Sequence, residues 1–296
     1  MDGILNINKP PGRTSFSVVA LVRKLSRERR VGYAGTLDAN AGGVLPVCLG
    51  RGTRVIEFII DTSKAYRARI RLGIATDTYD ATGKIVQKGD TSGISREQLE
   101  SALDTFCGSI VQTPPMYSAL KYKGQRLYKL ARAGITVERK SRPAMVYRIE
   151  LVDFEPPLAT IEVECARGTY IRSLAQDLGK LLGCGAHLEH LLRIRCGPFD
   201  IGDAVYLTRL EDAFGDNSWQ KLVYPIDTVL KHWSSVVVGE EQERVIKNGG
   251  GVVIEDGMNG DNGENRCRAY NRDGCFIAIL HFDTEKKQWQ PEKVFV

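Results

Sequence analysis

The sequence predicts an α+β fold: a large N-terminal domain with a central mixed or antiparallel sheet flanked by helices, followed by a small β-rich domain. Alternating apolar and polar residues indicate strands, and apolar stripes of helical period lie between them without a regular βαβ repeat. Beyond residue 233 only strand-like runs occur, separated by Gly, Asn and Asp turns, notably Asp256 to Gly263. The 296 residues, 43% of them hydrophobic, suffice for one large and one small core. We therefore expect domains at 1–232 and 233–296.

The first elements are a strand over residues 4–7 and a helix over residues 16–29. The strand must end in the segment Lys9-Pro10-Pro11-Gly12, since proline has no N–H to donate to a neighbouring strand. Thr14 and Ser15 are candidate N-caps of the helix. Its apolar stripe has the i, i+3, i+4, i+7 spacing, at Val18, Leu21, Val22 and Leu25.

Residues 32–43 show neither a helical nor a strand period, and four of the twelve are glycine, which predicts a tight loop. A buried strand follows at residues 44–48. Small residues on both sides of Asp38 let a ligand approach its carboxylate closely. On these residues alone, Asp38 is either a reactive carboxylate or an ordinary turn or capping residue.

The middle of the chain alternates strands and helices. A strand over residues 64–74 places Tyr66 on its apolar face and Arg67, Arg69 and Arg71 on the opposite face. A capping-box pattern, Ser95-x-x-Gln98, opens a helix at about residues 96–106. The remaining expected elements are a helix over 125–133, strands over 144–154 and 158–165, and a helix over 170–182.

Several function classes are excluded by missing motifs. The seven cysteines are odd in number and never spaced Cys-x-x-Cys, so neither a disulfide framework nor a zinc site is expected. His187 and His190 could share a helical face, but no third ligand is apparent, and we expect no metal. No phosphate-binding loop or dinucleotide fingerprint occurs, so no cofactor is expected. Without an apolar span of about 18 residues or a secretory signal, we expect a cytoplasmic protein with no membrane contact.

Positive charge is concentrated in two segments. Residues 1–72 hold 13 Lys and Arg against 5 Asp and Glu, and residues 117–148 hold 9 against 1, whereas residues 201–296 hold 11 against 16. Within 117–143 tyrosines alternate with basic residues, a combination that suits unpaired RNA because bases stack while phosphates are neutralised. The alternative is an amphipathic helix with a solvated basic face. The candidate RNA-binding residues are Lys121, Lys123, Arg126 and Arg132.

Four segments together resemble the TruB family of tRNA pseudouridine synthases, over about Gly3 to Pro198. They occur in the family's order and approximate spacing, and they are Asn8 to Ser15, Val31 to Val47 with Gly35-Thr36-Leu37-Asp38, Lys64-x-Tyr66 with Thr76 to Gly83, and Arg167 to Arg172. The resemblance implies a pseudouridine synthase fold and action on the T loop of tRNA, at position 55. It implies that 117–143 is the insertion that bacterial members fold over the T loop, and that the C-terminal domain is PUA-like.

The same resemblance assigns roles to single residues. Asp38 would attack or deprotonate the target ribose, Tyr66 would stack on the base and help remove the C5 proton, and Arg172 would pair with Asp38. An arginine partner is expected to favour the charged carboxylate and lower its pKa. Further RNA-binding residues would be Lys9, Asp80, Tyr170 and Tyr33, the last of which stands where the family usually has histidine.

Three functional hypotheses follow. The leading one is a stand-alone, monomeric bacterial enzyme that needs no partner protein. The first rival is the catalytic subunit of a guide-RNA ribonucleoprotein, similar to dyskerin. The second is a tRNA-folding protein that has lost catalysis through the change at Tyr33.

Overall fold

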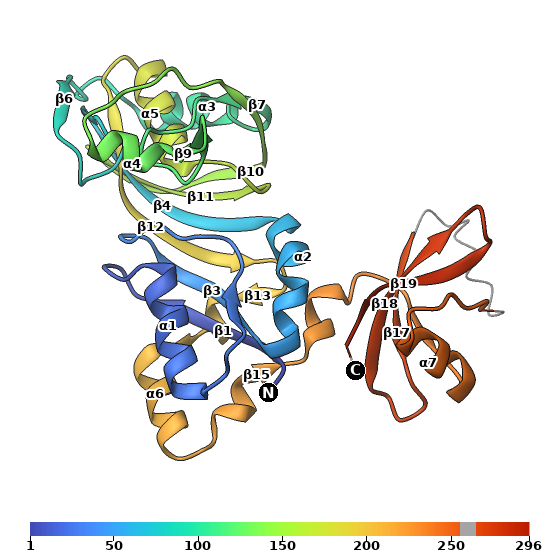
Figure 1. Cartoon of the computed structure of the whole chain (residues 1–296). Coiled ribbons are helices and arrows are strands. Elements are labelled where there is room, and N and C mark those ends of the chain that lie inside the picture. Colours follow the sequence, from blue (N-terminus) through green and yellow to red (C-terminus); the bar gives the residue numbers. More distant parts are fainter. Residues whose placement is uncertain (255–264, 296) are drawn as a thin grey trace.

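The computed structural model describes residues 1–254 and 265–295, and its two main sheets differ greatly in size (Figure 1). The larger sheet has eleven strands, and its main path runs β14-β1-β3-β12-β4-β11-β10-β7. It is mixed, because β1 pairs with β14 and β12 with β3 in parallel, while the other pairs are antiparallel. The smaller sheet has the order β16-β17-β18-β19. The expected α+β class, with a central mixed sheet and a small C-terminal sheet, is confirmed.

The strands of the described residues have these bounds: β1 Gly3–Lys9, β2 Val31–Tyr33, β3 Gly42–Leu49, β4 Lys64–Leu72, β5 Ile74–Thr76, β6 Ile85–Lys88, β7 Gly108–Gln112, β8 Lys121–Tyr122, β9 Gln125–Arg126, β10 Arg142–Glu155, β11 Leu158–Cys165, β12 Ala186–Cys196, β13 Phe199–Asp200, β14 Val205–Tyr206, β15 Val223–Tyr224, β16 Ser235–Val237, β17 Arg266–Tyr270, β18 Phe276–Asp283 and β19 Gln288–Val294. The helices are α1 Ser15–Ser26, α2 Ile56–Asp61, α3 Arg96–Asp104, α4 Leu127–Arg132, α5 Ile171–Leu181, α6 Leu207–Gly215 and α7 Glu240–Lys247, with 3-10 turns η1 Gly50–Val55, η2 Ile201–Asp203, η3 Trp219–Leu222 and η4 Ile226–Leu230.

Two of the hydrophobic cores on the larger sheet lie beneath helices. Helices α1 and α6 bury their apolar residues against β1 and β3, whereas α3 and α5 pack on β4, β10 and β11. In β4 the predicted alternation holds: Ala68 and Ile70 are fully buried, while Arg67 and Arg69 face the other side and pair with Glu162 and Glu189. Tyr66 contacts both cores, so it lies where they meet.

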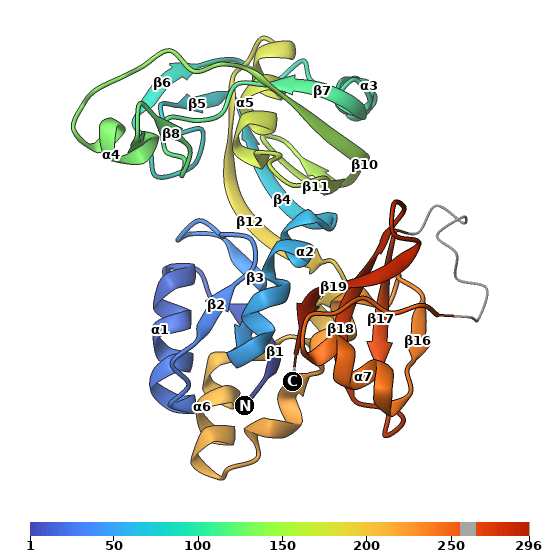
Figure 2. The ribbon, with the colours of Figure 1, turned by 45° about the vertical axis from the view of Figure 1, so that its right-hand side comes forward.

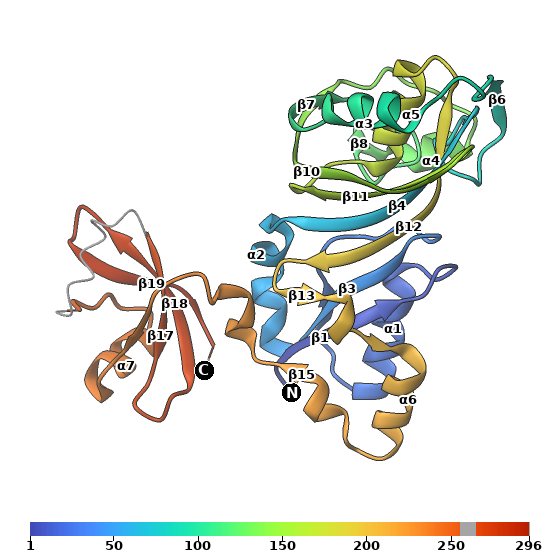
Figure 3. The same ribbon diagram turned by 180° about the vertical axis from the view of Figure 1, so that it is seen from behind.

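The second sheet packs beside η1 and α2, on the opposite side of the molecule from β8, β9 and α4 (Figures 2 and 3). Ile59 of α2 and Ile279 of β18 belong to one buried cluster, and burying each such side chain is worth roughly 1.5–3 kcal/mol. Phe58 and Trp233 meet edge to face at 5.1 Å. Polar contacts add to these, since Lys293 donates to the carbonyl of Arg54 at 2.8 Å.

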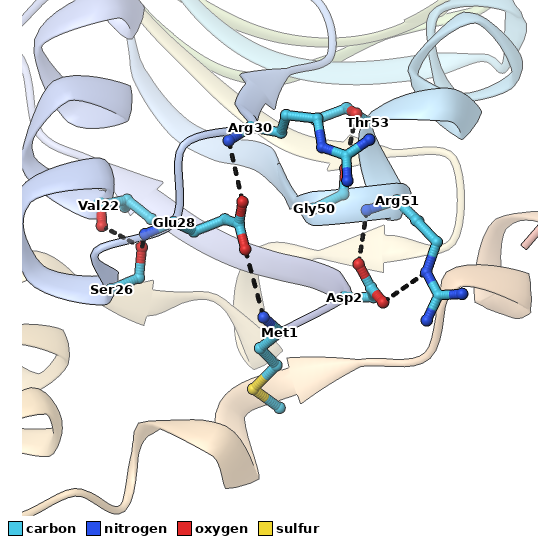
Figure 4. Close-up of polar contacts among 9 residues, drawn as sticks. All are labelled: Met1, Asp2, Val22, Ser26, Glu28, Arg30, Gly50, Arg51 and Thr53. Carbon is cyan, nitrogen blue, oxygen red and sulfur yellow. Dashed lines mark hydrogen bonds and ion pairs between the residues drawn. The ribbon is translucent and has the colours of Figure 1, made fainter. Parts of the chain in front are cut away.

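Polar contacts also tie Met1 and Asp2 to the turn after α1 and to η1 (Figure 4). The Met1 ammonium lies 3.3 Å from the Glu28 carboxylate, in the turn after α1. Asp2 accepts hydrogen bonds from the backbone N–H and the Nε of Arg51, at 2.6 and 2.7 Å. Arg51 in turn donates to the carbonyl of Phe295, so one guanidinium joins Asp2, just before β1, to the last described residue.

Three expectations about single elements were wrong in part. The first helix ends at Ser26 because Arg27 adopts a left-handed backbone with φ 55°, and the loop predicted for 32–43 begins inside β2 and ends inside β3. The helix predicted for 125–133 starts at Leu127, after a hairpin of β8 and β9. The capping box of α3 is present as predicted.

The segment with the two histidines was also misread, because it lies in strand β12 and not in a helix. His187 is buried, with Nδ1 at 2.7 Å from the carbonyl of Ile74, whereas His190 is exposed. The predicted turn at 256–263 lies outside the described residues. Across 1–254 and 265–295, no helix is long and apolar enough to span a membrane.

Candidate active site

Asp38 lies in the loop between β2 and β3. Hydrogen bonds from Gly12 and from Ser15, the first residue of α1, fix the position of this loop. The Ser15 hydroxyl, 1% exposed, accepts from the N–H of Leu37 at 3.0 Å and donates to its carbonyl at 3.2 Å. The N–H of Gly12 donates to the carbonyl of Ala39 at 2.8 Å. The loop is therefore fixed by hydrogen bonds on both sides of Asp38.

Lys9 completes this support, although we expected it to contact RNA. It is completely buried, and its ammonium donates to the carbonyls of Pro10, Arg13 and Ala39, at 3.0, 2.6 and 3.1 Å. Burial lowers its pKa to about 8. Since Lys9 has no exposed surface, a direct contact with RNA does not fit this structure, and its position fits support of the Asp38 loop instead.

The structure brings Asp38, Arg172 and Asp80 together from three distant segments. Arg172 Nη2 lies 2.9 Å from Asp38 Oδ2, and Nη1 lies 3.7 Å from Asp80 Oδ2. Asp80 also accepts hydrogen bonds from Thr78 Oγ1 and from the N–H of Thr82, at 2.7 and 3.0 Å. The Arg172 side chain is only 6% exposed, so both pairings act in a poorly hydrated setting.

The start of α5 is held so that Arg172 points at Asp38. Gln112 at the end of β7 uses its side-chain amide to pair with both the N–H and the carbonyl of Tyr170, at 3.0 and 3.2 Å. Ser173 donates to the carbonyl of Thr113 at 2.9 Å. Arg172 itself donates to the carbonyl of Tyr117 at 3.0 Å, which links it to the first residue of the segment 117–143. A cation in the first turn of a helix opposes the helix dipole, and the two carboxylates offset this cost.

These groups surround a pocket of about 230 Å³. Its walls include Asp38, Tyr66, Tyr170 and Arg172. Six further polar residues line it: Thr36, Lys64, Ser118, Arg167, Thr169 and Arg193. Burial raises the pKa of Tyr66 to about 12, so its phenol is neutral near pH 7. An aromatic ring, a carboxylate and a guanidinium therefore share one small cavity.

The pKa of Asp38 is raised, which corrects the expectation that its arginine partner lowers it overall. Loss of water contact within the pocket is the largest cause, followed by Arg172, which acts in the opposite direction, and by the neighbouring negative charge of Asp80. The carboxyl nevertheless remains open to a ligand, because 51% of its side-chain surface is exposed. A carboxyl with a raised pKa is a better proton acceptor once ionised.

Arg193 and Lys64 are site residues that the sequence reasoning missed. Both are buried cations, and their hydrogen bonds go to backbone carbonyls: Arg193 to Val44 and Gly35, and Lys64 to the end of α2. The alternation of β4 places Lys64 on the same face as Tyr66 and Ala68, but a lysine at the first position of the strand was not interpreted as buried. Arg193 lay in a segment read as helical, so its place opposite Tyr66 was not visible.

The remaining basic residues predicted to bind RNA lie on exposed surfaces, whereas Tyr33 is half-buried, and none of them lines the pocket. Lys121, Lys123 and Arg126 belong to the β8–β9 hairpin, and Arg132 ends α4. The Lys123 ammonium lies 5.6 Å from the ring centre of Tyr122. Tyr33 ends β2, with its hydroxyl 3.4 Å from that of Thr36 in the Asp38 loop. Within the described ranges, no group of three or more His, Cys, Asp or Glu side chains could hold a metal ion.

Family models match two adjacent parts of the chain. Residues 23–171 match the model described as "TruB family pseudouridylate synthase (N terminal domain)", and residues 172–231 match "tRNA pseudouridylate synthase B C-terminal domain". The chain belongs to the TruB family. A relative named tRNA pseudouridine synthase B from Dehalococcoides mccartyi (strain CBDB1) is 44% identical over the whole chain and 97% of its own length. One from Symbiobacterium thermophilum is 50% identical over 71% of each chain.

Solved structures share the architecture of this chain. The chain is similar to a chain of a Cbf5-Nop10-Gar1 complex, at 26% identity and a TM-score of 0.74, covering 99% of this chain and 85% of that one. A chain from an H/ACA ribonucleoprotein bound to a substrate RNA, at 24% identity and a TM-score of 0.75, shares the fold.

Proposed function

We propose that this protein isomerises uridine to pseudouridine at position 55, in the T loop of tRNA. The observation that carries the proposal is the pairing of Asp38 with Arg172 at 2.9 Å, on the wall of a pocket that also contains the ring of Tyr66. The relatives that match the whole chain are named tRNA pseudouridine synthase B, which supports tRNA as the substrate.

The chemistry needs few groups, since the base detaches at N1, rotates and rejoins the ribose through C5 with no change of oxidation state. A carboxylate and a proton acceptor therefore suffice. Asp38 is the carboxylate that attacks or deprotonates the ribose, Arg172 keeps it ionised, and Tyr66 stacks on the base. The uridine must leave its loop to enter the pocket, and the ring of Tyr66 replaces part of the stacking it loses.

Capture of the RNA is assigned to the exposed basic segment. Lys121, Lys123, Arg126 and Arg132 would neutralise phosphates of the T stem-loop, and Asp80 and Tyr170 would shape the pocket around the flipped nucleotide. We also place the boundary between the two domains between residues 232 and 233. The C-terminal domain would bind RNA in a PUA-like manner. Tyr33 keeps an aromatic face beside the Asp38 loop, so we expect Tyr33→His to change turnover by less than about 10³-fold, or roughly 4 kcal/mol.

We further propose that the enzyme is a cytoplasmic monomer that acts without a partner protein. A guide-RNA-dependent enzyme is the alternative, because the chain is also similar to a subunit of a Cbf5-Nop10-Gar1 complex. Turnover of bare tRNA by the purified chain would favour the stand-alone enzyme. Turnover that appears only when guide RNA or partner proteins are added would favour the alternative.

The direct test is release of tritium from tRNA labelled at uridine C5. The parent should release it, whereas Asp38→Asn should show no detectable turnover while it still binds tRNA. Asp104→Asn is a matched control, because Asp104 is an exposed carboxylate at the end of α3. Substantial turnover by Asp38→Asn would remove Asp38 from the mechanism, and an inactive parent would support a tRNA-binding protein without catalysis.

A further inference from the structure

Arg193 is a buried cation without a carboxylate partner. Its side chain lies in β12 and the residue is 1% exposed, yet none of the ion pairs found in residues 1–254 and 265–295 includes it. Nε donates to the carbonyl of Val44 at 2.7 Å, and Nη2 donates to the carbonyl of Gly35 at 2.9 Å. A buried charge that only neutral groups solvate is costly, so a sequence keeps one where its charge has a use.

The group that Arg193 faces is Tyr66. The two residues lie directly opposite each other in the antiparallel pairing of β12 with β4, and both side chains line the pocket. Directly opposed residues of antiparallel strands have Cβ atoms only about 5 Å apart, within easy reach of these long side chains. The positive charge of the guanidinium therefore acts on the Tyr66 oxygen over a short distance.

Other groups around Tyr66 make negative charge on its oxygen harder to form. Burial is the largest cause of the raised pKa of Tyr66. Arg193 acts in the opposite direction. Asp38 and Arg172 line the same pocket and largely neutralise one another. Arg193 is thus a buried cation placed directly opposite Tyr66, where it can stabilise a charged Tyr66 oxygen.

This inference rests on the proposed function and assigns one step of it. We propose that Arg193 is a positioning residue for removal of the C5 proton, holding the Tyr66 hydroxyl toward the base and stabilising the negative charge of its oxygen. Its bond to Gly35 also fixes the start of the Asp38 loop, so the same guanidinium sets the distance between the carboxylate and the tyrosine.

The step balances without a further reactant. When C5 bonds to ribose C1′, C5 carries both its original proton and the new carbon. The Tyr66 oxygen accepts that proton, and the electron pair of the C5–H bond restores the C5–C6 double bond. N1, released from the ribose, ends with a proton taken from water. The neutral Tyr66 phenol gives its own hydroxyl proton to water before the transfer, Arg193 stabilises the resulting phenolate, and the C5 proton then restores the neutral phenol.

The test separates this role from simple support of the fold. Arg193→Gln keeps hydrogen-bond donors but removes the charge, and Arg193→Lys keeps the charge without the forked geometry. Arg195→Gln is the matched control, since Arg195 lies in the same strand, is partly exposed and pairs with Glu164. Turnover is measured on tRNA with hydrogen or deuterium at uridine C5, so that the isotope effect reports how far proton removal limits the rate.

We expect Arg193→Gln to lower kcat by at least about 10²-fold, with KM changed less than about 3-fold and a larger C5 isotope effect than in the parent. Arg193→Lys should recover part of the rate, and Arg195→Gln should match the parent. A slower Arg193→Gln whose isotope effect is unchanged would overturn the assignment. If that variant does not fold, the same comparison with Arg193→Lys decides, because its isotope effect should also rise. An inactive parent would instead refute the proposed function itself.

Discussion

Replacing Gly43 by alanine should show whether this glycine is required only for its positive φ or also for the close contact between two strands. Gly43 is part of β3, between Lys9 of β1 and Arg193 of β12, and its φ is 102°. A Cβ added there would lie 2.2 Å from the carbonyl oxygen of Arg193 and 2.8 Å from its backbone nitrogen. Real Cβ contacts are at least 3.0 Å, so β3 and β12 must separate by 3.0 − 2.2 = 0.8 Å.

The cost can be worked from these distances. A side chain at positive φ costs on the order of 1 kcal/mol. Overpacking that forces backbone shifts adds roughly 2–3 kcal/mol, so Gly43→Ala should lower the free energy of unfolding by about 3–4 kcal/mol. Gly183→Ala is the matched control, because Gly183 has φ 75° and nothing within 4 Å of an added Cβ. It should cost only about 1 kcal/mol.

Urea unfolding of the two variants and the parent measures both values, and turnover on tRNA adds a functional reading. Because Arg193 faces Tyr66 and holds Gly35, separating β3 from β12 should also slow turnover in Gly43→Ala but not in Gly183→Ala. Equal destabilisation by the two substitutions, within about 0.5 kcal/mol, would refute the claim that strand contact requires this glycine.

Three further outcomes are expected. Arg172→Gln removes a positive charge that lowers the pKa of Asp38, so that pKa should rise further. The acid limb of the pH profile of kcat/KM, where activity falls as the carboxylate is protonated, should therefore move to higher pH. An acid limb at the same pH as in the parent would contradict this. Lys9→Met should lower the free energy of unfolding in urea by about 3 kcal/mol, roughly 1 for each carbonyl left without its donor, and should leave the salt dependence of tRNA binding unchanged. Lys123→Met should do the reverse: stability unchanged, and the slope of log K against log salt smaller by roughly 0.7–0.9, a result that an unaltered slope would exclude.

Much of the fold followed from local pattern. The alternation in β4, the Ser95 capping box and the strand at 158–165 depend on neighbouring residues alone, so the sequence predicted them correctly. The secondary structure of residues 186–196 was not predicted correctly, because the periodicity of a short apolar run with two histidines fits a helix or a buried strand equally well. This segment is a strand because it pairs with β4 and β3, and these contacts join residues that are far apart in the sequence.

The sequence by itself determined the family and the likeness of Asp38, Tyr66 and Arg172 to catalytic residues, because the order and spacing of the motifs can be read without the structure. Only the tertiary structure decided what surrounds them. Lys9 reads as one more basic residue, yet folding closes the Asp38 loop over it and turns it into a buried support. Arg193 is separated from Tyr66 by 127 positions (193 − 66), and they meet only because β12 returns antiparallel to β4. Burial and cross-strand distance set the charge of these groups, and both are properties of packing, which no local pattern contains.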